Sequence, residues 1–178
     1  EIVENVLSRT VKNLEADGGM CVVMDPETGE ILAMAGEPGF NPNNSGEFDL
    51  FERMNKCIAY NYEPGSTFKV LTAAAALEEG VLKPTDSLDG NNGIYESYGE
   101  VIRDHRPFSK ITFSEAIHYS SNVCFARVAD QLGNESLYNY ALNFGLGTRS
   151  GIDLPGEEAG IVHPIDKWSG RTRVTMAI

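Results

Sequence analysis

The segment Glu63–Leu77 has the sequence EPGSTFKVLTAAAAL, in which a Pro-Gly turn precedes a run of strong helix formers. Pro-Gly interrupts the structure before it, and Gly80 is a residue type at which helices commonly end. Ala and Leu in such a run are typical of a helix packed in a protein interior. The segment therefore predicts a buried helix with Ser66 and Lys69 in its first turn, and the rest of the chain is organised around it.

Ser66 and Lys69 are three residues apart, so a helix places them on one face, at the end where backbone N–H groups are unpaired. A serine hydroxyl is a weak nucleophile until a neighbouring base takes its proton. A lysine whose pKa is lowered by partial burial can be that base, and the Ser66 N–H can donate to a developing oxyanion. The pair is therefore a candidate nucleophile and general base.

The pattern alone is common, because about one S-x-x-K match is expected by chance in a chain of this composition. The context favours a function. An amine in the first turn of an Ala-rich buried helix is difficult to explain as a solvated surface group, since an unpaired buried amine is costly.

Ser120-Ser121-Asn122 lies between two predicted helices, where side chains project from a turn. Ser121 or Asn122 could simply cap the following helix, as these residue types prefer to do. A functional role is compatible with capping. Ser120 could relay a proton between Lys69 and a leaving group, and the Asn122 amide could hold Lys69 and a substrate carbonyl.

The remaining sequence predicts an α+β domain. Near-continuous apolar strands at 20–24 and 30–35 indicate a hairpin covered on both faces. The excursion 83–110 predicts at most short strands, and Thr112–Glu115 is a capping box. Helices are expected at 1–16, after that capping box, at 123–132 and at 135–144, with a loop at 145–164 and an ambiguous segment at 48–62.

Composition excludes several classes of function. The 178 residues carry a net charge of −12, which argues against binding nucleic acid or anionic lipid. No apolar run is long enough to span a membrane, and the chain does not open with a signal peptide. The three cysteines predict buried thiols. No metal or cofactor is expected, because no two of the three histidines have ligand spacing. These residues are Cys21, Cys57, Cys124, His105, His118 and His163.

Ser66-Thr67-Phe68-Lys69 and Ser120-Ser121-Asn122 resemble two of the three signatures of penicillin-binding proteins and serine β-lactamases. The surrounding sequence is similar to the transpeptidase domain of class B penicillin-binding proteins. The similar stretches cover nearly the whole chain in the family's order: DPETGEILAMA at 25–35, YEPGSTFK at 62–69, FGLG at 144–147 and GIDLPGE at 151–157.

The resemblance implies the penicillin-binding protein and serine β-lactamase fold, here mainly its helical subdomain with an amino-terminal hairpin of the central sheet. Residues 1–178 would be a partial transpeptidase domain without its carboxy-terminal strands. It also implies that Ser66 is acylated by D-Ala-D-Ala stem peptides of peptidoglycan and by β-lactams. Lys69 would be the base, Ser120 would transfer protons and Asn122 would position substrate.

The same resemblance implies a parent protein in the bacterial cell envelope. It would be membrane-anchored on the extracytoplasmic face and would act with cell-wall synthesis partners, this segment itself being soluble. The family's third signature, Lys-Thr-Gly or Lys-Ser-Gly, does not occur; Lys167-Trp168-Ser169-Gly170 carries an inserted tryptophan. The segment alone is therefore expected to be a poor catalyst. A non-catalytic β-lactam sensor or scaffold, or a serine β-lactamase, remain the alternatives.

Overall fold

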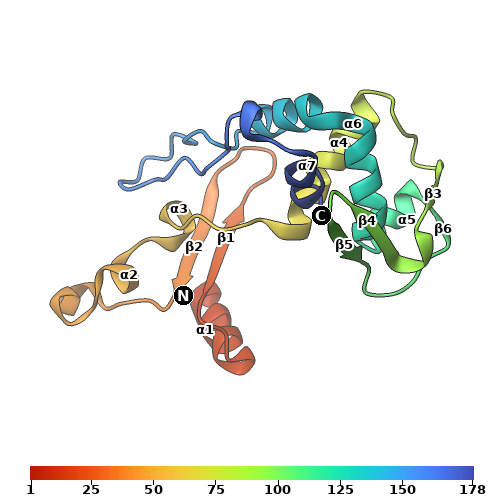
Figure 1. The fold of residues 1–178 in the computed structure, drawn as a ribbon. Helices are drawn as coiled ribbons and strands as arrows, with labels where there is room; N and C mark the ends of the chain where they lie inside the picture. The colour runs from red at the N-terminus through yellow and green to blue at the C-terminus, as the bar shows by residue number, and fades with distance from the viewer. The chain divides into compact units, whose positions relative to one another are not determined.

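The computed structural model describes residues 1–178, and the chain divides into two compact units (Figure 1). The first comprises Glu1–Asn61 and Gly151–Glu158, and the second comprises Tyr62–Ser150 and Ala159–Ile178. The predicted α+β class is confirmed, since helices and small antiparallel sheets occur together.

The first unit is built on an antiparallel hairpin of β1 (Gly19–Met24) and β2 (Ile31–Glu37). The helix α1 (Ile2–Leu14) packs against it, and a Cβ at Gly19 would lie 2.9 to 3.0 Å from the side chains of Val11 and Leu7. Gly19 thus allows the helix and the strand to approach closely. The other elements of this unit are η1 (Pro42–Glu47), α2 (Leu50–Arg53) and α3 (Lys56–Ala59).

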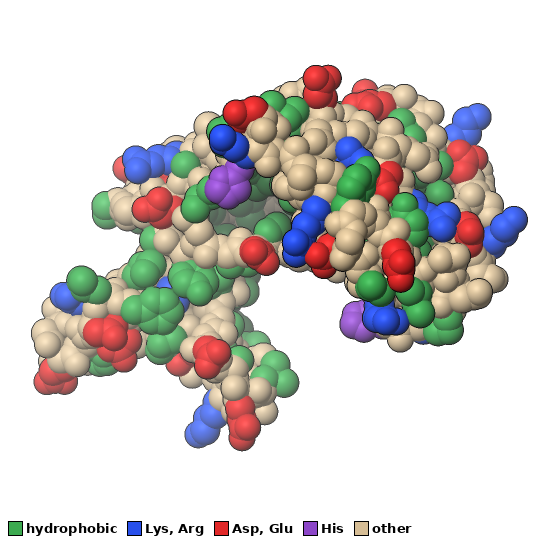
Figure 2. Space-filling model, viewed as in Figure 1, with side chains coloured by type: hydrophobic (Ala, Val, Ile, Leu, Met, Phe, Trp, Pro, Cys, Tyr) green, Lys and Arg blue, Asp and Glu red, His purple; other side chains and the backbone are tan.

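The hairpin is not covered on both faces, which corrects the prediction made from its apolar pattern. Val22, Val23, Met24 and Leu32 are exposed, Leu32 to 61%. The sheet of this unit has two strands only, so neither strand has a second neighbour there. Hydrophobic side chains (green) accordingly gather on the visible face of this unit in Figure 2.

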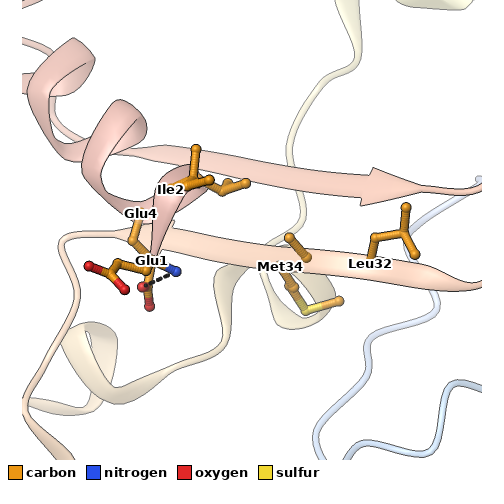
Figure 3. Close-up of a pocket in the computed structure, with 7 residues that line it drawn as sticks. Glu1, Ile2, Glu4, Leu32 and Met34 are labelled. Carbon is orange, nitrogen blue, oxygen red and sulfur yellow. Dashed lines mark ion pairs between the residues drawn. The ribbon is translucent and has the colours of Figure 1, made fainter.

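A depression between the first turn of α1 and the strand β2 shows the same incomplete cover (Figure 3). Leu32 and Met34 line it from β2, while Glu1, Ile2 and Glu4 line it from the helix. Its one ion pair joins the Glu1 amino group to Glu4 at 3.0 Å, and both groups are highly exposed. Such a pair contributes little to stability.

The second unit has a helical core surrounded by short strands. Its helices are α4 (Lys69–Glu78), α5 (Phe113–His118), α6 (Asn122–Asn143) and α7 (Gly170–Met176), with 3-10 turns η2 (Gly65–Phe68), η3 (Asn91–Gly93) and η4 (Ile165–Lys167). Its strands form two antiparallel pairs: β3 (Ser87–Asp89) with β6 (Lys110–Thr112), and β4 (Ile94–Ser97) with β5 (Glu100–Arg103).

The helices α4 and α6 lie side by side and share the main apolar cluster (Figure 1). Ala76, Phe113, Phe125 and Val128 are among its fully buried members. The two helices predicted for 123–144 are both present, and they meet at Gly133, whose φ of 80° and ψ of 174° interrupt the helical backbone. Glycine tolerates this conformation at little cost, so the break falls there.

A polar network joins α7 to α6 and to the β4–β5 hairpin. Arg173 of α7 donates to Asp130 of α6 at 2.8 Å and to the Tyr98 hydroxyl at 2.6 Å, and Tyr95 donates to Asp130 at 3.1 Å. The ring of Tyr98 also lies directly on Gly170, where any Cβ would collide with it. These contacts fix the hairpin against both helices.

Two further sequence-based expectations can be compared with the structure. Cys124 is fully buried as predicted, whereas Cys21 and Cys57 are only half-buried, because both belong to the thinly covered first unit. No helix combines the length and the apolar character needed to cross a lipid bilayer.

Candidate active site

Ser66 lies in the 3-10 turn η2, which runs directly into α4. The sequence predicted the first turn of an α-helix; the tighter turn found here has three residues per turn, so side chains three apart are stacked. Gly65 has a φ of 56°, a left-handed conformation that glycine accepts readily. Ser66 is exposed to solvent, whereas Lys69, one turn further along the chain, is 4% exposed.

The Lys69 amine is the centre of the site. Its Nζ lies 3.0 Å from Ser66 Oγ, 2.9 Å from Ser120 Oγ, 2.9 Å from the Ser120 carbonyl oxygen and 2.5 Å from Asn122 Oδ1. The four side chains selected from the sequence are therefore brought together from two distant segments. An ammonium group has three N–H donors, fewer than the four acceptors around it.

Burial lowers the pKa of Lys69 to about 8, and the negative charge of Asp104 opposes part of that shift. A sizeable fraction of the amine is therefore neutral slightly above neutral pH. A neutral amine offers a lone pair, to which the Ser66 hydroxyl can donate its proton across the 3.0 Å contact. The geometry and the titration of Lys69 both suit activation of Ser66.

The turn at residues 120–122 is shaped by its own backbone. Ser120 has a φ of 53°, and the N–H groups of Ser120 and Ser121 donate to the carbonyls of Ile117 and Ala116. Ser121 caps α6, accepting from the Cys124 N–H at 3.1 Å. The capping alternative thus holds for Ser121 alone. Its neighbours on either side, Ser120 and Asn122, are left to face Lys69.

Asn122 connects Lys69 to the end of β5. Its Oδ1 accepts from Lys69, and its Nδ2 donates to the Arg103 carbonyl at 3.0 Å. A side-chain amide has two N–H donors, so one donor remains for a further acceptor. That is the donor which the predicted contact with a substrate carbonyl requires.

Asp104 is the residue that sequence reasoning missed. Its carboxylate accepts from the Ser121 hydroxyl at 2.7 Å and from the Val123 N–H at 3.0 Å. It lies in the excursion 83–110, which has no periodicity and no motif. The only signal was that such long excursions are often functional.

The chain belongs to the penicillin-binding protein transpeptidase family: residues 19–178 match the family described as "Penicillin binding protein transpeptidase domain". Its relatives place it among the class B penicillin-binding proteins. It is 36% identical over 183 residues to the stage V sporulation protein D of Bacillus subtilis, covering 98% of this chain and 28% of that protein. It is 32% identical over 176 residues to the peptidoglycan D,D-transpeptidase FtsI of Escherichia coli, covering 99% of this chain and 30% of that protein.

Solved structures agree with this assignment. The transpeptidase domain of penicillin-binding protein 3 from Burkholderia pseudomallei superposes with a TM-score of 0.83 at 26% identity, covering 97% of this chain and 48% of that chain. A structure described as a peptidoglycan glycosyltransferase from Burkholderia ambifaria gives 0.84 at 27% identity, covering 97% of this chain and 51% of that one. The predicted transpeptidase fold is thereby confirmed. The chain spans less than a third of the length of the two curated relatives named above.

Proposed function

We propose that this chain carries the serine nucleophile of a peptidoglycan D,D-transpeptidase. The observation that supports the proposal best is the 3.0 Å separation of Ser66 Oγ from a buried amine with a lowered pKa. FtsI of Escherichia coli is named a peptidoglycan D,D-transpeptidase, and the chain aligns with it over nearly its whole length.

In the proposed reaction, neutral Lys69 takes the Ser66 proton as Oγ attacks the carbonyl carbon of the penultimate D-Ala in a stem peptide. The Ser66 N–H donates to the oxygen that becomes negative. The bond to the terminal D-Ala nitrogen then breaks, and that nitrogen receives the proton from Lys69 through the Ser120 hydroxyl, which lies 2.9 Å from the amine. The product is an ester on Ser66, and an amine of a second stem peptide attacks it in the reverse sequence.

Asn122 has a positioning role in this scheme. Its Oδ1 holds the amine of Lys69, and its remaining N–H is available to a carbonyl of the bound peptide. A β-lactam presents a strained amide carbonyl of the same kind, so it would acylate the same oxygen. Stem peptides and β-lactams are therefore the proposed ligands.

The relatives are proteins of cell-wall synthesis, which act in the bacterial envelope. We infer that the parent protein works at the extracytoplasmic face of the cytoplasmic membrane, where peptidoglycan is cross-linked. We also propose that the parent protein carries a membrane anchor and acts together with other proteins of cell-wall synthesis.

Covalent labelling by a fluorescent penicillin tests the proposal in the full-length protein. Ser66→Ala removes the nucleophile and should abolish the labelled band, while Lys69→Ala should abolish it by removing the base. Ser114→Ala is the matched control, since Ser114 is an exposed serine on α5 whose hydroxyl has no role in the scheme. A stable penicilloyl adduct on Ser66→Ala protein would show that the nucleophile has been assigned wrongly.

A further inference from the structure

Arg103, the last residue of β5, and Asp104, the residue after it, together hold the three residues at the start of α6, which are Ser121, Asn122 and Val123. The Arg103 carbonyl accepts from Asn122, and the Asp104 carboxylate accepts from Ser121 through one oxygen and from the Val123 N–H through the other. The Asp104 N–H donates to the Gly93 carbonyl at 3.0 Å, so its own backbone is held as well. Both Asp104 oxygens are thus committed to the turn that presents Ser120 and Asn122.

This support is itself anchored in the core. Ile102 of β5 is 5% exposed and packs with Val123 and Val174. On the same hairpin, Tyr95 and Ser97 donate to Asp130 at 3.1 and 3.4 Å. A group carried on so constrained a hairpin can hold its partners in one geometry.

Asp104 also acts on Lys69 electrostatically. Among the charged side chains around the amine, it is the one whose charge shifts the pKa of Lys69, and it shifts it upward against the effect of burial. A second titratable group near the start of α6 is the Cys124 thiol, whose pKa is raised mainly by burial and also by the charge of Asp104. Arg127 and Asp89 pair at 3.6 Å and act on Cys124. The face of Phe125 completes the surroundings, 5.7 Å from Nζ.

We propose that Asp104 is a positioning residue of the acyl-transfer site: its carboxylate fixes the Ser120–Asn122 turn against Lys69 and supplies the negative charge that balances the buried amine. This inference rests on the proposed function. The site then consists of five residues. Asp104, the fifth, belongs to neither signature and directly follows the β4–β5 hairpin.

The test measures the rate of acylation by a fluorescent penicillin between pH 6 and pH 10 in the full-length protein. Asp104→Asn keeps an oxygen for the Val123 N–H and removes the charge. The midpoint of the pH–rate profile of Asp104→Asn should move to lower pH. Without the negative charge the pKa of Lys69 falls, so the neutral amine is favoured. Asp104→Ala also removes both hydrogen bonds, from the Ser121 hydroxyl and the Val123 N–H. The acylation rate of this variant at the high-pH plateau should therefore fall by about tenfold or more.

Asp89→Asn is the matched control, because it removes a carboxylate from the same excursion without contacting the turn, and it should leave midpoint and plateau unchanged. Thermal melting of each variant shows whether it is folded, and Asp104→Asn carries the test if Asp104→Ala does not fold. An Asp104→Asn profile identical to wild type would overturn the inference, as would an equal shift in Asp89→Asn. Loss of labelling in Ser66→Ala, measured in parallel, would show that the proposed function stands even so.

Discussion

Lys69 is the residue on which the proposed chemistry depends most. Its amine is buried, and the pKa near 8 means that about one tenth is neutral at pH 7 and about nine tenths at pH 9. The direction of this pKa shift also affects the pH dependence of folding stability. Because the folded-state pKa lies below the ordinary value of 10.5, unfolding takes up a proton between these two values. The stability cost of burying Lys69 is therefore complete below pH 8 and shrinks as the pH rises from there.

We expect the rate of acylation by penicillin to rise about tenfold between pH 7 and pH 9, with a midpoint near 8, because only the neutral amine accepts the Ser66 proton. Stopped-flow or gel-based labelling of the full-length protein over this range measures it. A rate that does not change from pH 6 to pH 9 would mean that Lys69 is not the titrating base.

At the same scale, Ser66, Lys69, Ser120 and Asn122 could be selected from the sequence because each lies in a short motif. Helix spacing relates Ser66 to Lys69, and Ser120 and Asn122 lie at a junction between two predicted helices. Asp104 could not be found in this way. Its link to Ser121 and Val123 depends on how the β4–β5 hairpin packs against the start of α6, and Asp104 lies in no motif that would mark it for this contact.

At the scale of elements, α7 is joined to its neighbours by Arg173. The Arg173 and Asp130 side chains are 15% and 24% exposed, and Arg173 also donates to Asn134 and Tyr98. Since three elements of the second unit meet at this guanidinium, it should contribute more than a surface ion pair does.

Arg173→Leu should lower the free energy of unfolding by about 1–3 kcal/mol, because Asp130 is left without its charged partner. Arg171→Leu provides the control on the same helix. Arg171 pairs with Glu100 at 2.7 Å but is 64% exposed, so its loss should change stability by less than about 1 kcal/mol. Urea unfolding measures both values, and equal losses for the two variants would contradict the role given to the Arg173 network.

Helices and their ends were predictable where nearby residue types specify them. The break at Gly133 and the capping box of α5, in which the Thr112 and Glu115 side chains each accept from the other's N–H, follow from residue type. The apolar pattern of the hairpin wrongly predicted cover on both faces, whereas the resemblance, which implies missing carboxy-terminal strands, predicts the unfinished sheet that is found. An apolar run shows that a strand favours burial, but it does not reveal how many strands lie beside it.

At the scale of the whole molecule, all four motif side chains and Asp104 belong to one compact unit, whereas the exposed apolar strands belong to the other. A two-stranded sheet with apolar side chains in solvent presents unpaired backbone groups along its edges, and such edges pair with other chains.

We therefore expect the 178-residue chain to self-associate in solution. Val22→Lys combined with Leu32→Lys should shift it toward monomer, because both side chains are exposed on the hairpin and like charges repel. Ile161→Lys, at a 74% exposed loop position, should have no such effect. Sedimentation velocity distinguishes the cases, and a wild-type chain that stays monomeric at high concentration would contradict the expectation.

The surplus of acceptors around the Lys69 amine has a consequence for the dynamics of the site. Four oxygens lie within 3.0 Å of a nitrogen that can satisfy at most three of them, so its hydrogens can be redistributed by rotation about a single bond. A proton arriving from Ser66 and a proton leaving toward Ser120 then need no displacement of the lysine chain, which stays fixed by burial. Within the lysine side chain, the reorganisation is thus confined to rotation of the terminal ammonium group.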